Sequence, residues 1–239
     1  MIKDPDMRRA EEIQAVRELR PFQSMSEASF DKLAGIAFLQ RYPRDVVVLE
    51  QGDPPDMLHI VVEGAVEMYA ESRGERSTIA IFEPLSAFIL AAVMTDLPHL
   101  MSARTLQPTR LLMIPAPVIH DLMREDREFA LAMADELARG FRTMVKTTKN
   151  LKLRDAAPRV INYLLTLRAE GGNPETLTLP YEKSVIASLL GMTRESLSRV
   201  LPKLREHGVT VRGKDVVFQD VAKARALAKP DPLIDDPNG

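Results

Sequence analysis

The spacing of apolar residues changes along the chain and predicts different structures in successive parts. Between residues 37 and 115 the period changes to two, and the strand candidates are the short runs at 46–49, 58–62, 65–69, 77–82 and 110–114. Alternation with a period of two predicts strands, and Gly, Pro and Asp between the runs predict turns. Gly52 and Gly64 are expected where a turn needs positive φ. Short, closely spaced strands indicate an antiparallel β-roll of the jelly-roll kind.

From residue 127 to residue 152, apolar residues recur alternately four and three positions apart. This spacing predicts one long helix with a coiled-coil seam. Such a seam could pack on its own domain. Because the chain offers no comparable partner helix, we expect it to pair with a second copy as a parallel homodimer. The seam runs through Ala130, Ala134, Leu137, Phe141, Met144, Thr148 and Leu151, and we assign the last five to the dimer interface.

Residues 193–204 predict a helix with two distinct faces. Leu197, Leu201 and Leu204 lie on one apolar stripe, and Val200 falls on it too. The opposite side presents Glu195, Ser198 and Arg199, and Thr193 is a plausible N-cap. A carboxylate, a hydroxyl and a guanidinium on one face suit the base edges in a DNA major groove. Taken alone, the stripe also fits a surface helix with solvated charges.

The neighbouring segments favour the DNA-binding interpretation. Residues 184–191 form a short amphipathic segment that ends at Gly191, which predicts a helix-turn-helix. Residues 159–169 predict a preceding helix, and residues 208–218 predict two strands around an Arg-Gly-Lys-Asp turn, a basic wing suited to phosphates. The expected partner is double-stranded DNA. The candidate contact residues are Thr193, Arg194, Glu195, Ser196, Ser198, Arg199, Arg212 and Lys214.

Composition sets limits on this interpretation. The 239 residues allow two domains, and the net charge of −2 does not itself indicate nucleic acid. Between residues 194 and 214, however, the acidic residues Glu195 and Glu206 stand against a larger set of basic ones, which makes a local basic patch. The basic residues are Arg194, Arg199, Lys203, Arg205, Arg212 and Lys214. The absence of cysteine excludes disulfides, a thiol switch and a cysteine-ligated iron–sulfur cluster. With no signal peptide or membrane-length apolar run, we expect a cytoplasmic protein without a membrane partner.

The predicted fold class is α+β, with an N-terminal β-roll, a long dimerisation helix and a C-terminal winged helix-turn-helix. The boundaries are residues 1–124 for the roll with N-terminal helices, 125–154 for the long helix, and 155–229 for the winged helix. Residues 155–158 interrupt the helical pattern and mark the hinge. Residues 230–239 are acidic and rich in proline, and we expect them to be disordered.

This order of domains resembles the Crp/Fnr superfamily of bacterial transcription regulators over residues 20–228. The resemblance is carried by residues 52–64, Gly-Asp-Pro-Pro-Asp-Met-Leu-His-Ile-Val-Val-Glu-Gly, and by Glu195-x-x-Ser198-Arg199. The reading head is similar to the Fnr type, which implies a palindromic TTGAT-N-ATCAA-like site. Glu195 and Arg199 would read its G·C pair and Ser198 the neighbouring thymine. RNA polymerase is a further partner if the protein is an activator. Pro202 departs from the pattern, and we expect a bend beyond the reading residues.

The resemblance makes the roll a sensor domain, but not one for cyclic AMP. Family members that bind cyclic nucleotides use a Gly-Glu pair and an Arg-Ser pair. Here Phe88-Ile89 replaces the first pair and Met101 replaces the arginine. A phosphodiester against this wall would lose its hydration without compensation, at a cost of roughly several kcal/mol.

Residues 91–99 and 159–167 resemble the Dnr/NnrR branch, whose members respond to nitric oxide through haem. The expected effector pocket contains Phe88, Ile89, Met94, His99 and Met101, with His99 the candidate haem ligand. The alternative is a pocket filled by its own side chains, in a regulator that needs no ligand. His59 is expected to face out of the roll, and His120 and His207 to be surface or hydrogen-bonded residues.

A metal enzyme with a cupin-like roll is the alternative from another functional class. Such a site needs clustered His and carboxylate ligands inside the roll. Only His59 and His99 are available there, without metal-ligand spacing. We therefore do not expect an enzyme.

Overall fold

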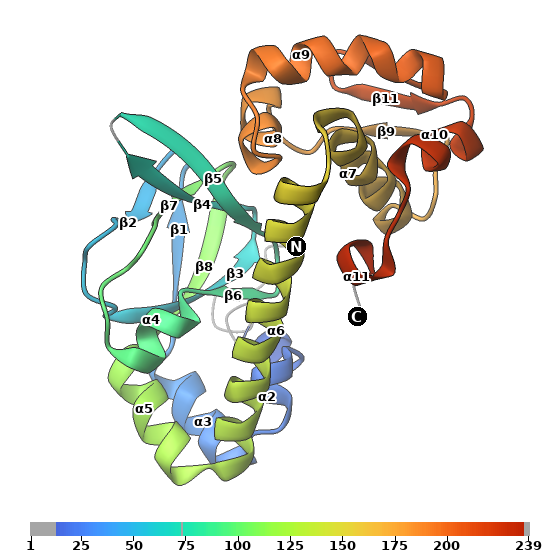
Figure 1. The fold of residues 1–239 in the computed structure, drawn as a ribbon. Coiled ribbons are helices and arrows are strands. Elements are labelled where there is room, and N and C mark those ends of the chain that lie inside the picture. The colour runs from blue at the N-terminus through green and yellow to red at the C-terminus, as the bar shows by residue number, and fades with distance from the viewer. Residues whose placement is uncertain (1–12, 73, 237–239) are drawn as a thin grey trace, which may run out of the picture. The chain divides into compact units, whose positions relative to one another are not determined.

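A computed structural model describes residues 13–72 and 74–236 (Figure 1). The chain forms two compact units, of which the first ends at Gly140 and the second begins at Phe141. This boundary falls inside the long helix α6 (Arg127–Leu153). The sequence prediction treats residues 125–154 as a separate part, whereas each unit contains part of this helix.

The first unit contains two four-stranded antiparallel sheets that form the predicted β-roll (Figure 1). One sheet has the order β1-β8-β3-β6 and the other the order β2-β7-β4-β5. The strands are β1 (Phe38–Tyr42), β2 (Val47–Leu49), β3 (Met57–Glu63), β4 (Val66–Ser72), β5 (Glu75–Phe82), β6 (Ser86–Phe88), β7 (Ser102–Thr105) and β8 (Thr109–Pro115). Gly52 and Gly64 have φ of 96° and 93°, as predicted. The sequence did not predict β1, β6 and β7.

The strand β3 is buried on both faces and separates two apolar cores. Leu58 and Ile60 belong to a core between the first sheet and the helices. Val61 belongs to a second core between the two sheets, together with Phe88 and Met68. We call this second core the roll interior. Because both faces of β3 are covered, its buried stretch is apolar except for His59.

Helices cover the outer face of the first sheet. They are α2 (Arg20–Gln23), α3 (Glu27–Ile36), α4 (Leu90–Thr95), α5 (Ala116–Glu125) and the beginning of α6, and residues 13–17 are also helical. Asp126 caps α6 by accepting the Phe129 N–H at 3.1 Å, and it accepts the Ser26 N–H at 2.9 Å. Burial raises the pKa of Asp126, but these hydrogen bonds and those of nearby serine hydroxyls outweigh burial and hold it at about 2. Residues 1–12 of the predicted N-terminal helices lie outside the described part.

The second unit contains the predicted winged helix. Its helices are α7 (Ala156–Glu170), α8 (Lys183–Leu189), α9 (Arg194–Lys203), the 3₁₀-helix η1 (Leu204–His207) and α10 (Val221–Ala228). A small sheet of order β10-β11-β9 contains β9 (Thr176–Thr178), β10 (Val209–Arg212) and β11 (Asp215–Phe218). Ile161 and Leu164 of α7 pack with Leu197 and Leu201 of α9 in its core. No helix in the described residues is long and apolar enough to cross a bilayer.

The prediction of a disordered tail is wrong for residues 230–236. They include a short helix, α11 (Pro232–Asp235), whose N-cap Asp231 accepts the Leu233 N–H at 2.8 Å. Asp235 pairs with Arg154 at the end of α6. The acidic composition therefore serves capping and ion pairing, which a composition-based argument does not detect. The last part of the predicted tail, residues 237–239, lies outside the described residues.

Candidate nucleic-acid interface

The turn between α8 and α9 requires a glycine. Gly191 has a φ of 62°, which disfavours a side chain. A Cβ atom at this position would also lie 2.6 Å from Leu151 Cδ2. The last turn of α6 therefore packs directly against the helix-turn-helix turn.

Helix α9 begins with the predicted side-chain cap. Thr193 Oγ1 accepts the Ser196 N–H at 3.2 Å and lies 3.1 Å from Ser196 Oγ. Leu197 and Leu201 are buried in the core of the second unit. Glu195, Ser198 and Arg199 are exposed on the other side of the helix, and so is Arg194 at its first position. The apolar face thus anchors α9 while the polar face is accessible.

Glu195 is held in its ionised form. Its own backbone N–H and the Thr193 hydroxyl lower the pKa of the carboxyl, and the charges of Arg194 and Arg199 lower it further. An ionised carboxylate only accepts hydrogen bonds, which is the property needed to bind a cytosine amino group. Arg199 is exposed one helical turn further along.

Pro202 lies inside α9, one residue before its end. The helix then continues as the 3₁₀-helix η1 and ends at Gly208, where φ is 77°. A proline removes a backbone donor and crowds the preceding turn. The turn before Pro202 nevertheless stays α-helical, and the change to a 3₁₀-helix comes after it. Glu195, Ser198 and Arg199 all precede Pro202 and lie in the α-helical part, and the expected bend stays a prediction.

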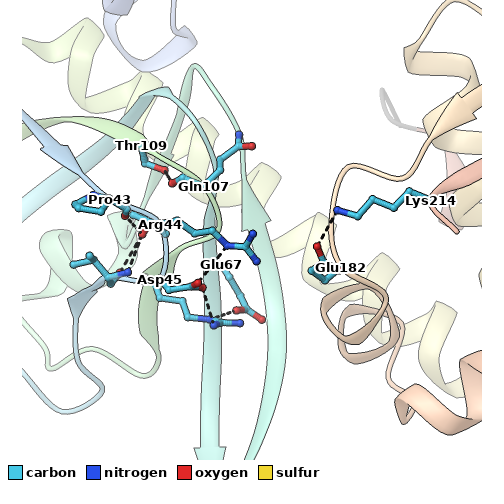
Figure 2. Close-up of polar contacts among 11 residues, drawn as sticks. Pro43, Arg44, Asp45, Glu67, Gln107, Thr109, Glu182 and Lys214 are labelled. Atoms are coloured by element: carbon cyan, nitrogen blue, oxygen red, sulfur yellow. Dashed lines mark hydrogen bonds and ion pairs between the residues drawn. The ribbon is translucent and has the colours of Figure 1, made fainter.

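The wing is a two-stranded hairpin with Gly213 at its tip, where φ is 60°. Arg212 is exposed beside it. Lys214 Nζ lies 2.9 Å from Glu182 Oε1, and Glu182 is the N-cap residue of α8 (Figure 2). The sequence prediction missed this pair because the two residues are remote in sequence. It ties the wing to the first helix of the helix-turn-helix.

Arg159 was not among the predicted site residues. It extends from α7 to the helix-turn-helix turn, where its Nη1 lies 3.4 Å from the Cβ position at Gly191. Its Nε is buried and makes no hydrogen bond with any described residue. The sequence marks Arg159 only as part of a helix, and no local signal connects it with Gly191.

The predicted effector-pocket residues do not all come together. Phe88, Ile89 and Met101 pack in or against the roll interior. The Phe88 ring lies between other aromatic rings, with centroid distances of 5.2 Å to His59 and 5.6 Å to Phe82. Met94 packs instead against the core between the first sheet and the helices, as Ile89 also does.

The prediction that His59 faces out of the roll is also wrong. Its side chain enters the roll interior, where it stacks on Phe88 and is 5% exposed. Neither ring nitrogen has a hydrogen bond of normal geometry to the described residues. Burial lowers the pKa of His59 to about 4, with the Met57 backbone opposing this and the His99 charge adding to it. Alternation misassigned His59 because both faces of β3 are buried.

His99 is held in its loop by backbone hydrogen bonds. Its carbonyl accepts the Gly52 N–H at 2.8 Å, and its own N–H donates to the Asp53 carbonyl at 2.9 Å. The ring is 5% exposed, and Nδ1 has no hydrogen-bond partner in the described part of the chain. Burial lowers the pKa of His99, and Asp53 and Asp56 oppose the shift. The described residues contain no cluster of three or more metal-binding side chains.

The other two histidines lie outside the roll, as expected. His120 Nε2 on α5 lies 2.6 Å from the Val93 carbonyl oxygen. His207 lies at the end of η1 and lines a pocket of about 310 Å³ with Pro158, Leu227 and Lys229. Neither residue contributes to the roll interior.

The predicted seam of α6 changes its surroundings along the helix. In the first unit, Ala130 of this seam is half-buried, Ala134 is exposed, and Leu137 packs partly against the core between the first sheet and the helices. The fully buried residues of this part of α6, Phe129 and Met133, lie outside the predicted seam. Beyond Gly140, Phe141 is 71% exposed and Met144 50%, while Thr148 and Leu151 are also exposed. Phe141, Met144 and Thr148 are therefore exposed seam positions, whereas Leu151 also contacts the turn at Gly191.

Comparison with known proteins agrees with this architecture. Residues 39–126 match the model of the cyclic nucleotide-binding domain, and residues 158–227 match the Crp-like helix-turn-helix domain. The Global nitrogen regulator of Synechococcus elongatus is 26% identical over 199 residues, which cover 80% of this chain and 90% of the relative. The CRP-like cAMP-activated global transcriptional regulator of Mycobacterium tuberculosis is 25% identical over 194 residues, covering 79% and 87%.

Solved structures extend the similarity to the whole fold. A regulatory protein from Silicibacter pomeroyi has 29% sequence identity and a TM-score of 0.61, with 92% of this chain and 100% of that chain covered. The named relatives are transcription regulators rather than enzymes. With its β-roll, long helix and winged helix in this order, the chain belongs to the Crp/Fnr family of transcription regulators.

Proposed function

We propose that this chain is a homodimeric transcription regulator that reads a palindromic TTGAT-N-ATCAA-like DNA site with α9. The observation that carries the proposal is the division of α9 into a buried apolar face and an exposed face with Glu195, Ser198 and Arg199. A recognition helix needs this division, because one side anchors it while the other reads base edges.

Each exposed side chain has a role that its chemistry supports. The Glu195 carboxylate accepts from a cytosine amino group, Arg199 donates to guanine, and Ser198 contacts the neighbouring thymine. Thr193, Arg194, Ser196 and Arg212 lie near the helix start or on the wing, where they contact phosphates. Lys214 also contacts a phosphate. It does so either after its ion pair with Glu182 breaks or while the pair is still formed.

The second copy pairs through the exposed part of the α6 stripe. Phe141, Met144, Thr148 and Leu151 follow Leu137 on the predicted seam and are exposed. Large apolar side chains at this spacing are stabilised by a parallel partner helix. A two-fold dimer presents two copies of α9, so a palindromic site follows from the symmetry.

Cyclic AMP is not the ligand in this proposal. Phe88 fills the roll interior, and Met101 packs against it, where a cyclic nucleotide needs polar and cationic groups. No ionic partner for a phosphodiester comes from these side chains, and its desolvation would cost roughly several kcal/mol.

Haem is the cofactor that the resemblance to nitric-oxide-responsive regulators implies, with His99 as its ligand. The buried, unpartnered Nδ1 of His99 has the chemistry of a ligand atom. His59, Phe82 and Phe88 nevertheless pack ring against ring at the roll interior, so a haem inserted between these rings would break their contacts. This packing favours the second candidate, a regulator of the same fold that binds DNA without a ligand.

Two experiments test these statements. Full-length protein is used to select sites from random double-stranded DNA; we expect a two-fold symmetric motif with TTGAT-like halves, and an asymmetric motif or no enrichment would contradict the proposal. The absorption spectrum of protein purified from haem-replete cells, before and after nitric oxide, separates the two forms of control. A Soret band that shifts with nitric oxide would reject the ligand-independent form.

A further inference from the structure

The C-terminal segment, residues 230–236, is bound to the end of α6 by a partly buried ion pair. Arg154 Nη1 lies 2.6 Å from Asp235 Oδ1 and Nη2 lies 2.5 Å from Oδ2, so the pair is bidentate. The side chains are 9% and 21% exposed. Bidentate pairs between arginine and carboxylate fix orientation as well as distance, unlike most exposed ion pairs.

Each side chain of this ion pair also makes a hydrogen bond to a residue of its own segment, which helps to fix its orientation. Asp235 Oδ2 also accepts the Asp231 N–H at 2.7 Å, and Asp231 caps α11. Arg154 Nη1 also donates to Asn150 Oδ1, one turn earlier, at 3.2 Å. Burial raises the pKa of Asp235, but Arg154 and the Asp231 N–H outweigh it and hold the pKa below its usual value. The carboxylate is therefore ionised at neutral pH.

Lysines of α6 add contacts to the same segment. Lys146 Nζ donates to the Asp236 carbonyl at 2.7 Å, and Lys149 Nζ donates to the Leu233 carbonyl at 3.4 Å. At 100° per residue, Lys146 lies about 160° around α6 from Met144 and from Thr148, and Lys149 lies about 140° and 100° from them. The segment therefore covers the back of the helix and leaves the proposed dimer seam uncovered.

Arg154 lies where the long helix α6 ends and the winged helix begins, so its ion pair can affect how these two parts are joined. α6 ends at Leu153 and α7 begins at Ala156, so Arg154 lies in the short break between them. On the far side of the break, Asn162 of α7 donates to the Ala228 carbonyl at the end of α10, at 2.8 Å. The chain runs from Ala228 directly into the segment that Arg154 holds. The C-terminal segment thus bridges the break from α10 back to α6.

We propose that Arg154 and Asp235 are positioning residues for DNA reading, which clamp α7 and the helix-turn-helix at a fixed angle to the last turns of α6. This inference rests on the proposed dimeric function. In a dimer, the paired α6 helices set the distance between the two copies of α9. If the break between α6 and α7 were flexible, that distance would vary. The Arg154–Asp235 pair does not contact α9. It therefore acts on the distance between the two copies of α9 in the dimer and not on their contacts with bases.

The test compares Asp235→Asn with wild type on three kinds of DNA: the palindromic site, the same site with one base pair added or removed at its centre, and a single half-site. Asparagine keeps the size of the side chain but removes the charge. We expect about tenfold weaker binding to the palindrome, which corresponds to the loss of one charge-assisted contact. Binding to the half-site should be unchanged, and the preference for the natural spacing should decrease.

Two further variants make the result specific. Glu175→Gln removes one negative charge from an exposed position of the same unit and should behave like wild type. The double variant Arg154→Asp with Asp235→Arg restores an ion pair with reversed charges and should recover part of the spacing preference. Thermal unfolding of each variant checks that the winged helix is folded.

Equal weakening on half-site and palindrome would overturn the inference, because it would show a purely structural role in the winged helix. No change on any DNA would overturn it as well. If wild-type protein itself lacks a preference for the palindrome or for its spacing, the proposed dimeric function fails first, and the inference fails with it.

Discussion

His59 and Phe88 stack inside the roll, with ring centroids 5.2 Å apart and ring planes inclined by 25°. They come from the adjacent strands β3 and β6, where they are paired in register. The stack places an imidazole where the described residues give its nitrogens no normal hydrogen bond. A protonated ring would be strongly disfavoured there, so the roll is folded around a neutral histidine.

This makes the stability of the roll dependent on pH. The pKa of His59 is about 4 in the folded chain, against 6.5 for the free side chain. Below pH 6.5, His59 binds a proton in the unfolded chain but stays neutral in the folded chain. The free energy of unfolding therefore falls as the pH decreases towards 4. We expect a loss of about 2 kcal/mol between pH 7 and pH 5 from this residue. His59→Phe, which keeps an aromatic ring in the stack, should remove that loss, as measured by urea unfolding at both pH values.

The control for His59 is His207→Gln, in the other unit. This variant should keep the wild-type dependence on pH. If His59→Phe loses as much stability as wild type between pH 7 and pH 5, the neutral buried imidazole is not the cause.

Asp126 gives a second dependence on pH, in a more acidic range. Its pKa is about 2 in the folded chain, against 3.8 for the free side chain. The stabilisation is complete above pH 4 and is lost as the pH falls from 4 towards 2, because the carboxylate that accepts the Ser26 and Phe129 N–H groups becomes protonated. It amounts to about 2 kcal/mol.

Asp126→Asn should lower the stability at pH 6 by about 1–2 kcal/mol, since a neutral amide is a weaker cap for α6. The difference from wild type should shrink at pH 3. Urea unfolding at the two pH values measures it. Asp121→Asn, an exposed change in the neighbouring α5, should have little effect at either pH. A difference that stays constant from pH 6 to pH 3 would contradict the assignment.

Phe141→Asp tests the dimer seam. A charge at this 71% exposed position disturbs nothing inside the chain but would be buried against a second copy of α6. We expect dimers at micromolar concentration for wild type and monomers for the variant, measured by sedimentation equilibrium. Leu131→Asp is a matched control, because Leu131 is also exposed on α6 but lies about 120° around the helix from the seam. Dimers of unchanged affinity for Phe141→Asp would place the interface elsewhere.

Sequence patterns predicted the elements that are long or that carry distinctive caps. The apolar stripe with Leu197 and Leu201 identified α9. Thr193 was correctly predicted as its N-cap, the residue before the helix begins at Arg194. The period of α6 is visible because it persists over many turns. Strands β6 and β9 have three residues each, which is too short for a period of two to appear. Strand β2 is equally short, but it was predicted because it lies in the continuous apolar run at 46–49.

The remaining errors have physical causes in particular residues. His59 was assigned to the surface because alternation separates inside from outside only when one face of a strand is exposed. Asp235 was assigned to a disordered tail because its partner, Arg154, is distant in sequence. The Glu182–Lys214 pair was missed for the same reason. Contacts between remote residues leave no mark on local spacing.

The contact of Arg199 with a G·C pair is the central claim, and a double-mutant cycle between protein and DNA tests it most directly. Binding free energies are measured at fixed salt concentration for wild type and Arg199→Ala, each on the palindromic site and on a site with the G·C pairs changed to A·T. The two changes should be strongly non-additive, with a coupling of about 1–3 kcal/mol for each half-site. Additive losses would show that Arg199 does not read this base pair, and would contradict the account.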